Sequence, residues 1–270
     1  MDKYRVYMRT EKSKSLNHRV NEDRYFFSEY KFMNDEKICV LIIADGMGGL
    51  SEGDRASKNA VLGFLKAFYE KMVNFYMETD AELFSISCFA DKLEKIVKDS
   101  IKSANIEVCK NADPYIPTGT TFSVICITDS YAVAANVGDS PIYMYHARTR
   151  RMKLISKLQT KAELDVEVNQ YERYSSEYYA NEHLLYQSLG EHSKLEEDDI
   201  YSCIIGKLEK GDMFLIGSDG AFGRMQEYEI LEILYKCEQE EEEYILLQLF
   251  ELAYIDKKDD QTAILYIVCE

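Results

Sequence analysis

The sequence predicts an α+β fold in which β-sheets pack on one another and helices cover the outer faces. Two observations support this prediction. Apolar runs rich in β-branched residues, which are typical of buried strands, occur in both halves of the chain, and long segments with apolar residues at helical spacing lie between and after them. The predicted order is strands, a helix pair, strands and then helices, which does not fit the regular alternation of a Rossmann-type sheet.

Each predicted strand is a short apolar run bounded by turn residues. The first run ends in a glycine-rich loop at residues 45–49, a conformation that glycine adopts easily. Two later runs are separated only by Asp129 and Ser130, which predicts a hairpin. The predicted strands are residues 38–44, 120–127, 131–137, 141–146, 213–217 and 263–269.

Four segments have their apolar residues on one helical face. The predicted helices are residues 54–77, 89–108, 227–236 and 241–254. Residues 156–200 are polar, rich in tyrosine and only weakly periodic. An insertion of this kind after a strand is either a flap close to a functional site or a surface helix or irregular cap, and the sequence does not separate the two.

The composition favours one compact domain over residues 1–270. The length allows one large domain on a prior of roughly 150 residues per domain, and no Pro-, Gly- or Ser-rich linker interrupts it. The net charge of −16 argues against nucleic-acid binding, and no run approaches the ~18 apolar residues of a membrane span. Seven cysteines, an odd number without CxxC spacing, suggest a reducing compartment. We therefore expect a soluble, cytoplasmic, monomeric protein.

Five acidic motifs lie next to apolar runs. They are Asn21-Glu22-Asp23, Asp45-Gly46, Gly138-Asp139-Ser140, Gly217-Ser218-Asp219-Gly220 and Asp259-Asp260. Each motif alone is weak, because an Asp-Gly pair at a strand end is usually a turn. Together they offer carboxylates beside glycines, which is the oxygen-rich environment that hard divalent cations prefer. No histidine–cysteine set has zinc-ligand spacing, so magnesium or manganese is the expected ion.

In their order along the chain these motifs resemble those of the metal-dependent protein phosphatases of the type 2C family. The resemblance spans Tyr4 to Val268, and residues 119–121 match the Gly-Thr-Thr of the family. It implies two packed, mostly antiparallel sheets flanked by helix pairs, a four-layer α/β/β/α sandwich. It also implies a bacterial-type enzyme that hydrolyses phosphoserine and phosphothreonine in proteins with a water activated by two Mn²⁺ or Mg²⁺ ions. Its partners would be phosphorylated proteins and a cognate serine/threonine kinase.

The resemblance implies a role for each matching position. Asp45 would bridge the two ions, and the carbonyl of Gly46 would bind one of them. Asp139 and Asp219 would form a weaker third site, as in bacterial members. Asp23, Asp219 and Asp259 would complete the binding of the pair, directly or through water, with Glu22 beside them. No covalent phospho-enzyme is expected, because the sequence has neither a Cys-x5-Arg nor a GxSxG nucleophile signature.

Three departures from the family pattern affect this expectation. The arginine that often precedes the first motif is replaced by His18, and Arg19 follows it. Arg19 either replaces the phosphate-binding fork or is, like His18, an ordinary exposed residue. Met47 stands where some relatives have a histidine that protonates the leaving group. Pro141 and Asp260 replace an arginine and an asparagine, and both changes spare the expected ligands.

Two other functions compete with an active protein phosphatase. A non-catalytic regulatory or binding module of the same fold would not need every expected carboxylate, and an unpaired buried carboxylate is costly. A phosphatase for small phosphorylated metabolites would share all of these residues, and no sequence feature separates it from a protein phosphatase.

Overall fold

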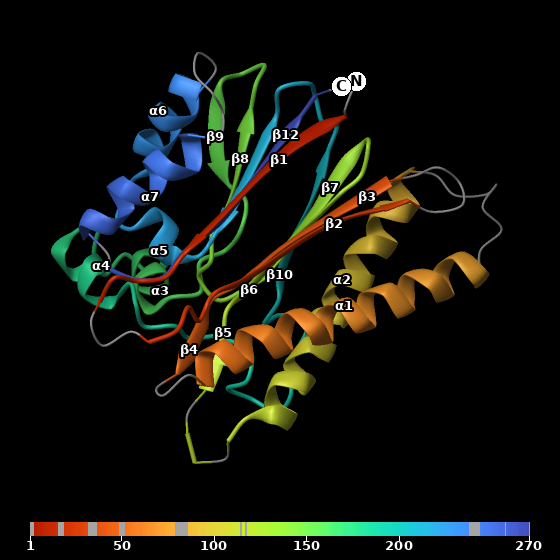
Figure 1. Ribbon diagram of the computed structural model, residues 1–270, viewed down its shortest axis with the longest axis horizontal. Coiled ribbons are helices and arrows are strands. Elements are labelled where there is room, and N and C mark those ends of the chain that lie inside the picture. The colour runs from red at the N-terminus through yellow and green to blue at the C-terminus, as the bar shows by residue number, and fades with distance from the viewer. Residues whose placement is uncertain are drawn as a thin grey trace.

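The computed structural model describes residues 3–15, 19–31, 37–48, 52–78, 86–113, 115–116, 118–237, 244–256 and 258–269. Two five-stranded sheets lie face to face in the middle of the molecule (Figure 1). The first sheet contains, in spatial order, β1 (Tyr4–Glu11), β12 (Gln261–Val268), β11 (Met213–Gly217), β8 (Ile142–His146) and β9 (Arg151–Leu154). The second contains β10 (Tyr201–Gly206), β7 (Tyr131–Val137), β6 (Phe122–Ile127), β3 (Lys37–Ala44) and β2 (Arg24–Lys31).

Neighbouring strands in both sheets are antiparallel. A two-stranded ribbon of β4 (Gly46–Gly48) and β5 (Thr118–Thr120) follows β3 and precedes β6. Two packed antiparallel sheets with helices outside are the fold that the sequence predicts, and that prediction is confirmed.

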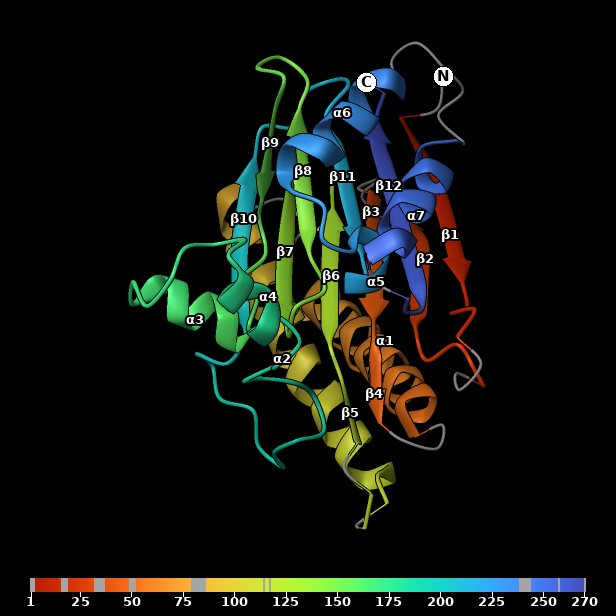
Figure 2. The same cartoon turned by 90° about the vertical axis from the view of Figure 1, so that its left-hand side faces the viewer.

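A helix pair covers the outer face of each sheet (Figures 1 and 2). The second sheet is covered by α1 (Glu52–Glu78) and α2 (Ile86–Asn111), and the first by α6 (Glu227–Cys237) and α7 (Tyr244–Asp256). The described residues also form the short helices α3 (Lys161–Glu167), α4 (Ser176–Asn181) and α5 (Asp219–Phe222). The side-chain oxygens of Thr160 and Ser175 cap the first turns of α3 and α4, which explains where these helices begin.

Three apolar cores hold the four layers together. One lies between α1, α2 and the second sheet, one between the two sheets, and one between the first sheet and α6 and α7. Residues of β3 alternate between the first core (Val40, Ile42) and the second (Leu41, Ile43). Because both faces of β3 are buried, its sequence is a continuous apolar run rather than an alternating one.

The inner strands lie where the sequence predicts them, and the edge strands were missed. β1, β2, β9 and β10 each lie at the edge of a sheet. Their residues are half exposed, and polar side chains interrupt the apolar pattern. The prediction of one strand over residues 120–127 was wrong at Thr121, where the chain leaves the ribbon and the Thr121 amide donates to the carbonyl of Asp45 at 2.9 Å.

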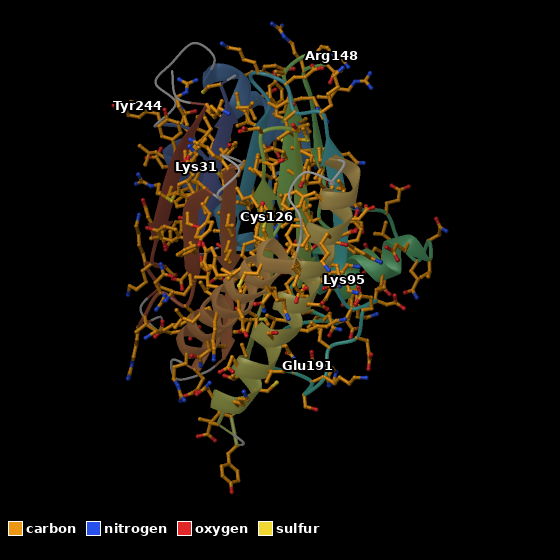
Figure 3. All side chains as sticks on the ribbon, turned by 90° about the vertical axis from the view of Figure 1, so that its right-hand side faces the viewer. Lys31, Lys95, Cys126, Arg148, Glu191 and Tyr244 are labelled. Carbon is orange, nitrogen blue, oxygen red and sulfur yellow. The ribbon has the colours of Figure 1, made fainter. Side chains whose placement is uncertain are left out.

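The predicted helices are confirmed with somewhat longer limits, except that residues 241–243 lie outside the described residues. The expected burial of cysteines is confirmed for Cys39 and Cys126, and Figure 3 shows Cys126 among packed side chains in the interior. Arg148 and Glu191, by contrast, lie at the surface. Across the described part of the chain, no helix combines the length and apolarity needed to cross a bilayer.

We predict that Phe64→Ala removes a contact that joins α1 to the second sheet. Phe64 is fully buried, and its ring centroid lies 5.4 Å from that of Phe68 and 5.2 Å from that of Phe122. Loss of a buried phenyl ring should lower the free energy of unfolding by about 3–5 kcal/mol. Equilibrium denaturation with urea measures this change.

The matched control is Leu62→Ala on the same helix, where the side chain is 55% exposed. It should change the free energy of unfolding by less than about 0.5 kcal/mol. Equal effects of the two substitutions would mean that α1 does not pack on the second sheet through Phe64.

Candidate active site

The strand register brings the acidic motifs to one end of the sandwich. In the first sheet the end of β11 pairs with the start of β12, with Gly217 opposite Ala263, and the end of β1 pairs with the same start. In the second sheet the end of β3 pairs with the start of β2, with Ala44 opposite Arg24, and the end of β7 pairs with the start of β6. Within each sheet the motifs therefore lie at one end.

Asp23 joins the two sheets at this end. Its Oδ2 accepts a 2.7 Å hydrogen bond from the hydroxyl of Ser218, which directly precedes Asp219. Its Oδ1 is buried and, among the described residues, has no hydrogen-bond partner. Burial is the main reason that the pKa of Asp23 rises to about 7, and the nearby charges of Asp260 and Asp259 add to it, while the Ser218 bond opposes it.

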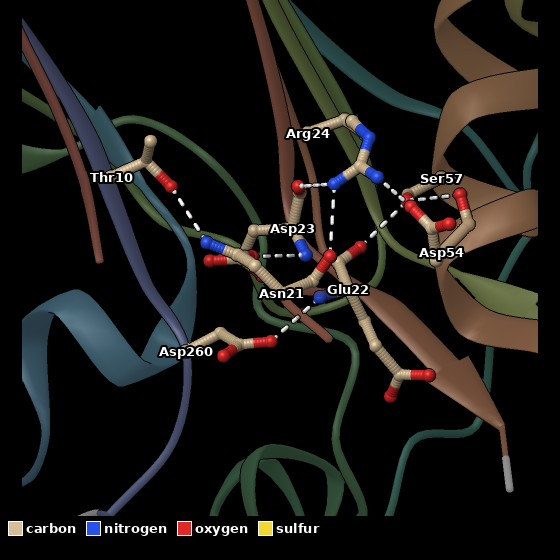
Figure 4. Close-up of polar contacts among 8 residues, drawn as sticks. All are labelled: Thr10, Asn21, Glu22, Asp23, Arg24, Asp54, Ser57 and Asp260. Carbon is tan, nitrogen blue, oxygen red and sulfur yellow. Dashed lines mark hydrogen bonds and ion pairs between the residues drawn. The ribbon is translucent and has the colours of Figure 1, made fainter. Parts of the chain in front are cut away.

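Asp260 fixes the segment that carries the first motif. Its Oδ1 accepts a hydrogen bond from the amide of Ser13 and its Oδ2 one from the amide of Glu22, both at 2.7 Å. Figure 4 shows this contact with Glu22, together with the bonds around Asn21 and Asp23. A carboxylate can accept from both amides, whereas the amide group of an asparagine could accept with only one of its two polar atoms. Asp260, which stands where the resemblance leads one to expect an asparagine, therefore has a structural role that an asparagine could fill only in part.

Glu22 lies where three segments come very close together. Its carbonyl accepts a 2.6 Å hydrogen bond from the hydroxyl of Ser57 in α1. A Cβ on Gly46 would lie 2.2 Å from the carbonyl oxygen of Gly53, and a Cβ on Gly53 would lie 2.9 Å from Oε1 of Glu22. Only glycine fits at either position. The Glu22 carboxylate therefore lies against Gly53 at the start of α1, and Gly53 in turn contacts Gly46 at the start of β4.

An ion pair closes the opposite side of this segment. The guanidinium of Arg24 pairs with the carboxylate of Asp54 and donates to the carbonyls of Asn21 and Asp23. In Figure 4 the Glu22 carboxylate points away from this pair. Arg24 therefore holds the backbone of the first motif from one side and leaves the glutamate directed to the other.

The two threonines of the Gly-Thr-Thr motif hold the backbone of Asp45. Its carbonyl accepts hydrogen bonds from the Thr121 amide at 2.9 Å and from the Thr120 hydroxyl at 2.8 Å. Its amide donates to the Thr121 hydroxyl at 3.0 Å. The same hydroxyl lies 2.6 Å from that of Ser140, the residue after Asp139. The motif thus connects the Asp45 loop to the Asp139 turn.

Asp139 and Asp219 line one cavity of about 100 Å³, together with residues of the segment 156–200, of strands β8 and β9, and of the stretch from α5 to the start of α6. Asp259 lies close to Gly220, since a Cβ on that glycine would be 3.0 Å from the Asp259 Cβ. Arg19 is exposed to solvent. His18 lies outside the described residues.

The structure therefore brings the sequence-predicted residues to one end of the sandwich, but not into one tight cluster. Over the described residues, no three acidic, histidine or cysteine side chains converge closely enough to hold a single ion. Even so, the donors suit a hard divalent cation. Asp23 has a buried carboxylate oxygen without a partner, and the charges of Asp259 and Asp260 act on the same carboxyl group.

Several supporting residues were missed from the sequence. Ser57 and Gly53 contact the first motif from the start of α1, Asp54 pairs there with Arg24, and Ser218, between β11 and α5, bonds Asp23. A glycine in the first turn of a long amphipathic helix was the available signal, because it often marks a close backbone approach. The role of Asp260 had no local signal, since its two donors come from residues distant in sequence.

Comparison with known proteins agrees with this geometry. The sequence model of the family described as protein phosphatase 2C matches residues 12–249. The protein phosphatase PhpP of Streptococcus pneumoniae is 28% identical over 208 residues, covering 75% of each chain. The serine/threonine phosphatase stp of Listeria innocua is 28% identical over 211 residues, covering 75% of this chain and 74% of its own.

Solved structures share the fold. The serine/threonine phosphatase PstP/Ppp of Mycobacterium tuberculosis superposes with a TM-score of 0.76 at 20% identity, covering 99% of each chain. The catalytic domain of a serine/threonine protein phosphatase PstP in complex with two manganese ions superposes with a TM-score of 0.71 at 21% identity, again over 99% of each chain.

We predict that Asp23→Asn removes a pH dependence from the stability of the metal-free protein. The folded-state pKa of Asp23 is raised from 3.8 to about 7, so its contribution to stability is complete below about pH 4 and is lost as the pH rises through 7. In chelator, the substitution should raise the free energy of unfolding at pH 8 by about 2–4 kcal/mol. The free energy of unfolding of the variant should also fall less than that of the parent between about pH 4 and pH 7. Denaturant unfolding across the pH range measures both.

The control is Asp91→Asn on α2, which changes an exposed aspartate and should leave the pH profile unaltered. A profile of the Asp23 variant that follows the parent at every pH would assign the burial cost to another group.

Proposed function

Since this chain belongs to the protein phosphatase 2C family, we propose that it removes phosphate from phosphoserine and phosphothreonine in proteins with the help of bound divalent cations. The names of its relatives as protein or serine/threonine phosphatases support this activity. The phosphoproteins on which it acts would be products of a serine/threonine kinase.

The observation that carries the proposal is the meeting of acidic strand ends where the two sheets join. Asp23, just before β2, accepts a hydrogen bond from Ser218, just after β11 of the other sheet, and Asp260 accepts one from the amide of Glu22. Acidic groups that repel one another are held together here by hydrogen bonds to neutral partners. Such an arrangement is costly unless a cation compensates it.

We assign the cation ligands by position in the family motifs. Asp45 would bridge two ions, the Gly46 carbonyl would bind one, and Asp139 with Asp219 would hold a weaker third. Asp23, Asp219 and Asp259 would complete the binding of the pair, with Glu22 beside them. The PstP structure with two manganese ions supports manganese, and magnesium has the same ligand preference. When bound, such ions neutralise phosphate charge and lower the pKa of water.

The residues of this chain would hold the site in place before substrate arrives. Thr120 and Thr121 fix the backbone of Asp45 from both sides, and Asp260 fixes that of Glu22. These bonds reach main-chain groups, so they do not compete with ligand oxygens of the side chains. A preorganised site does not spend substrate binding energy on ordering itself.

Arg19 would bind the phosphate of the substrate. Its side chain is exposed and, over the described residues, makes no hydrogen bond or ion pair, so it can reach a phosphate on a protein surface. A guanidinium suits this role because its planar fork matches phosphate oxygens.

We predict that phosphatase activity is lost in chelator and restored by manganese or magnesium. An aryl phosphate and a phosphothreonine peptide should both be hydrolysed, and the peptide should be preferred over small phosphorylated metabolites. Initial rates with each substrate, before and after chelation, measure this. Full activity in a metal-free preparation would exclude the cation role, and no turnover with any ion would favour a non-catalytic module.

We predict that Asp219→Ala and Asp259→Ala each lower turnover by at least ~10²-fold, the scale for losing one electrostatic element of a catalytic site. Each should also reduce the rise in melting temperature that manganese produces, because the ion stabilises only the state that binds it. Asp91→Ala serves as the control and should keep both. Near-normal turnover together with a full manganese shift in either variant would remove that residue from the ligand set.

A further inference from the structure

The cavity beside Asp139 and Asp219 has an aromatic and acidic lining. Its volume is about 100 Å³, and its lining includes Tyr174 and Tyr178 from the segment 156–200 and Glu227 from the first turn of α6. The rings of Tyr174 and Tyr178 meet edge to face, with centroids 5.7 Å apart. Ring faces attract cations through their quadrupole, and a carboxylate beside them strengthens that preference.

Two arginines at this cavity already have acidic partners. Arg173 forms an ion pair with the buried carboxylate of Glu163. Arg224 pairs with Glu182 at 2.9 Å, and its guanidinium lies over the ring of Tyr179. The two pairs are neutral, so neither arginine gives the cavity an excess of positive charge for an anion.

Glu227 also lines the cavity and takes part in neither of these ion pairs. Over the described residues it makes no hydrogen bond or ion pair, yet it lines the cavity. Burial, and to a smaller extent the charge of Glu227, raises the pKa of Tyr174 and of Tyr143, so the glutamate is close enough to act on both rings. If bound cations use Asp139 and Asp219, Glu227 still leaves the cavity with negative charge.

The backbone of Tyr174 supports a functional role. Its φ of 66° lies in the left-handed region, which is unfavourable for a bulky residue. Such strain persists where the surrounding structure holds a side chain in place, and it concentrates at ligand-binding sites. Here it directs an aromatic ring to the cavity beside the proposed cation ligands.

We propose that this cavity binds the side chain of a lysine or arginine that lies close to the phosphorylated residue in a protein substrate. Asp139 and Asp219 form one wall, so a side chain in the cavity and a phosphate at the site can belong to one short peptide. The inference rests on the proposed phosphatase function and adds a sequence preference to it. The cavity favours a basic side chain because it is lined by the tyrosine rings and by Glu227 and has no excess of positive charge.

The test uses the manganese-loaded protein and phosphothreonine peptides in which one lysine replaces alanine at each flanking position in turn. At one position lysine should raise kcat/KM roughly tenfold, mainly by lowering KM, and glutamate there should not, as expected for one cation–π contact with an adjacent carboxylate. Glu227→Gln should reduce this preference to about twofold or less, and added salt should weaken it in the parent.

Two further variants separate recognition from folding. Tyr174→Phe keeps the ring face and should keep the preference, whereas Tyr174→Leu should lose it. Glu232→Gln changes an exposed glutamate of the same helix, away from the cavity, and should keep it. A carboxylate in the first turn of a helix also interacts favourably with the helix dipole, so Glu227→Gln can lower the stability of the protein slightly. The measured quantity is therefore the ratio of kcat/KM between two peptides, which a small loss of stability does not alter.

The outcomes distinguish the two proposals. Hydrolysis of all peptides at equal rates would overturn the basic subsite and leave the phosphatase function standing, as would a preference that survives Glu227→Gln or one that favours glutamate. Failure to hydrolyse every peptide and an aryl phosphate, with manganese present, would overturn both.

Discussion

The packing of the two sheets against each other is the constraint on which the rest of the structure depends. β3 supplies Leu41 and Ile43 to the core between the sheets, and β11 supplies Phe214 and Ile216. This contact fixes the distance and the direction of one sheet relative to the other. The candidate site needs that fixed relation, because its parts come from both sheets and meet only at their shared end. Core packing and site geometry are therefore two results of one apolar interface.

The inner strands could be predicted from the sequence because burial on both faces leaves a continuous apolar run, as in β3. The edge strands could not, because their residues are only partly buried and polar side chains interrupt their apolar pattern. β1 illustrates this: Arg5, Met8 and Thr10 are exposed, and the charged residues Arg5, Arg9 and Glu11 interrupt its apolar residues, so no apolar run marks it. A sequence without an alignment also offers no pairing information, and the partner of β1 is the last strand of the chain.

The candidate site could be predicted only in part, because only some of its features are local in the sequence. A carboxylate next to a glycine at a strand end is a local pattern, and the order of five such patterns is specific to one family. The contacts that hold these carboxylates are not local. Asp260 accepts hydrogen bonds from the amides of Ser13 and Glu22, and Ser218 donates one to Asp23. The sequence around Asp260 or Ser218 does not indicate either contact, because the partners are distant in sequence. Likewise, the tyrosines of the segment 156–200 form a cavity wall only after α3 and α4 have been placed.

The pairing of β1 with β12 has a consequence for synthesis in the cell. Tyr4 lies opposite Val268, and the amide of Cys269 donates to the carbonyl of Lys3 at 2.9 Å, so the first strand finds its partner only when the last strand has been made. The same late segment brings Asp259 and Asp260, and Asp260 anchors the loop that follows β1. Until the ribosome has released this segment, β1 therefore lacks its strand partner. A chain interrupted before this segment would therefore lack both the partner of β1 and the bonds that hold the first acidic motif.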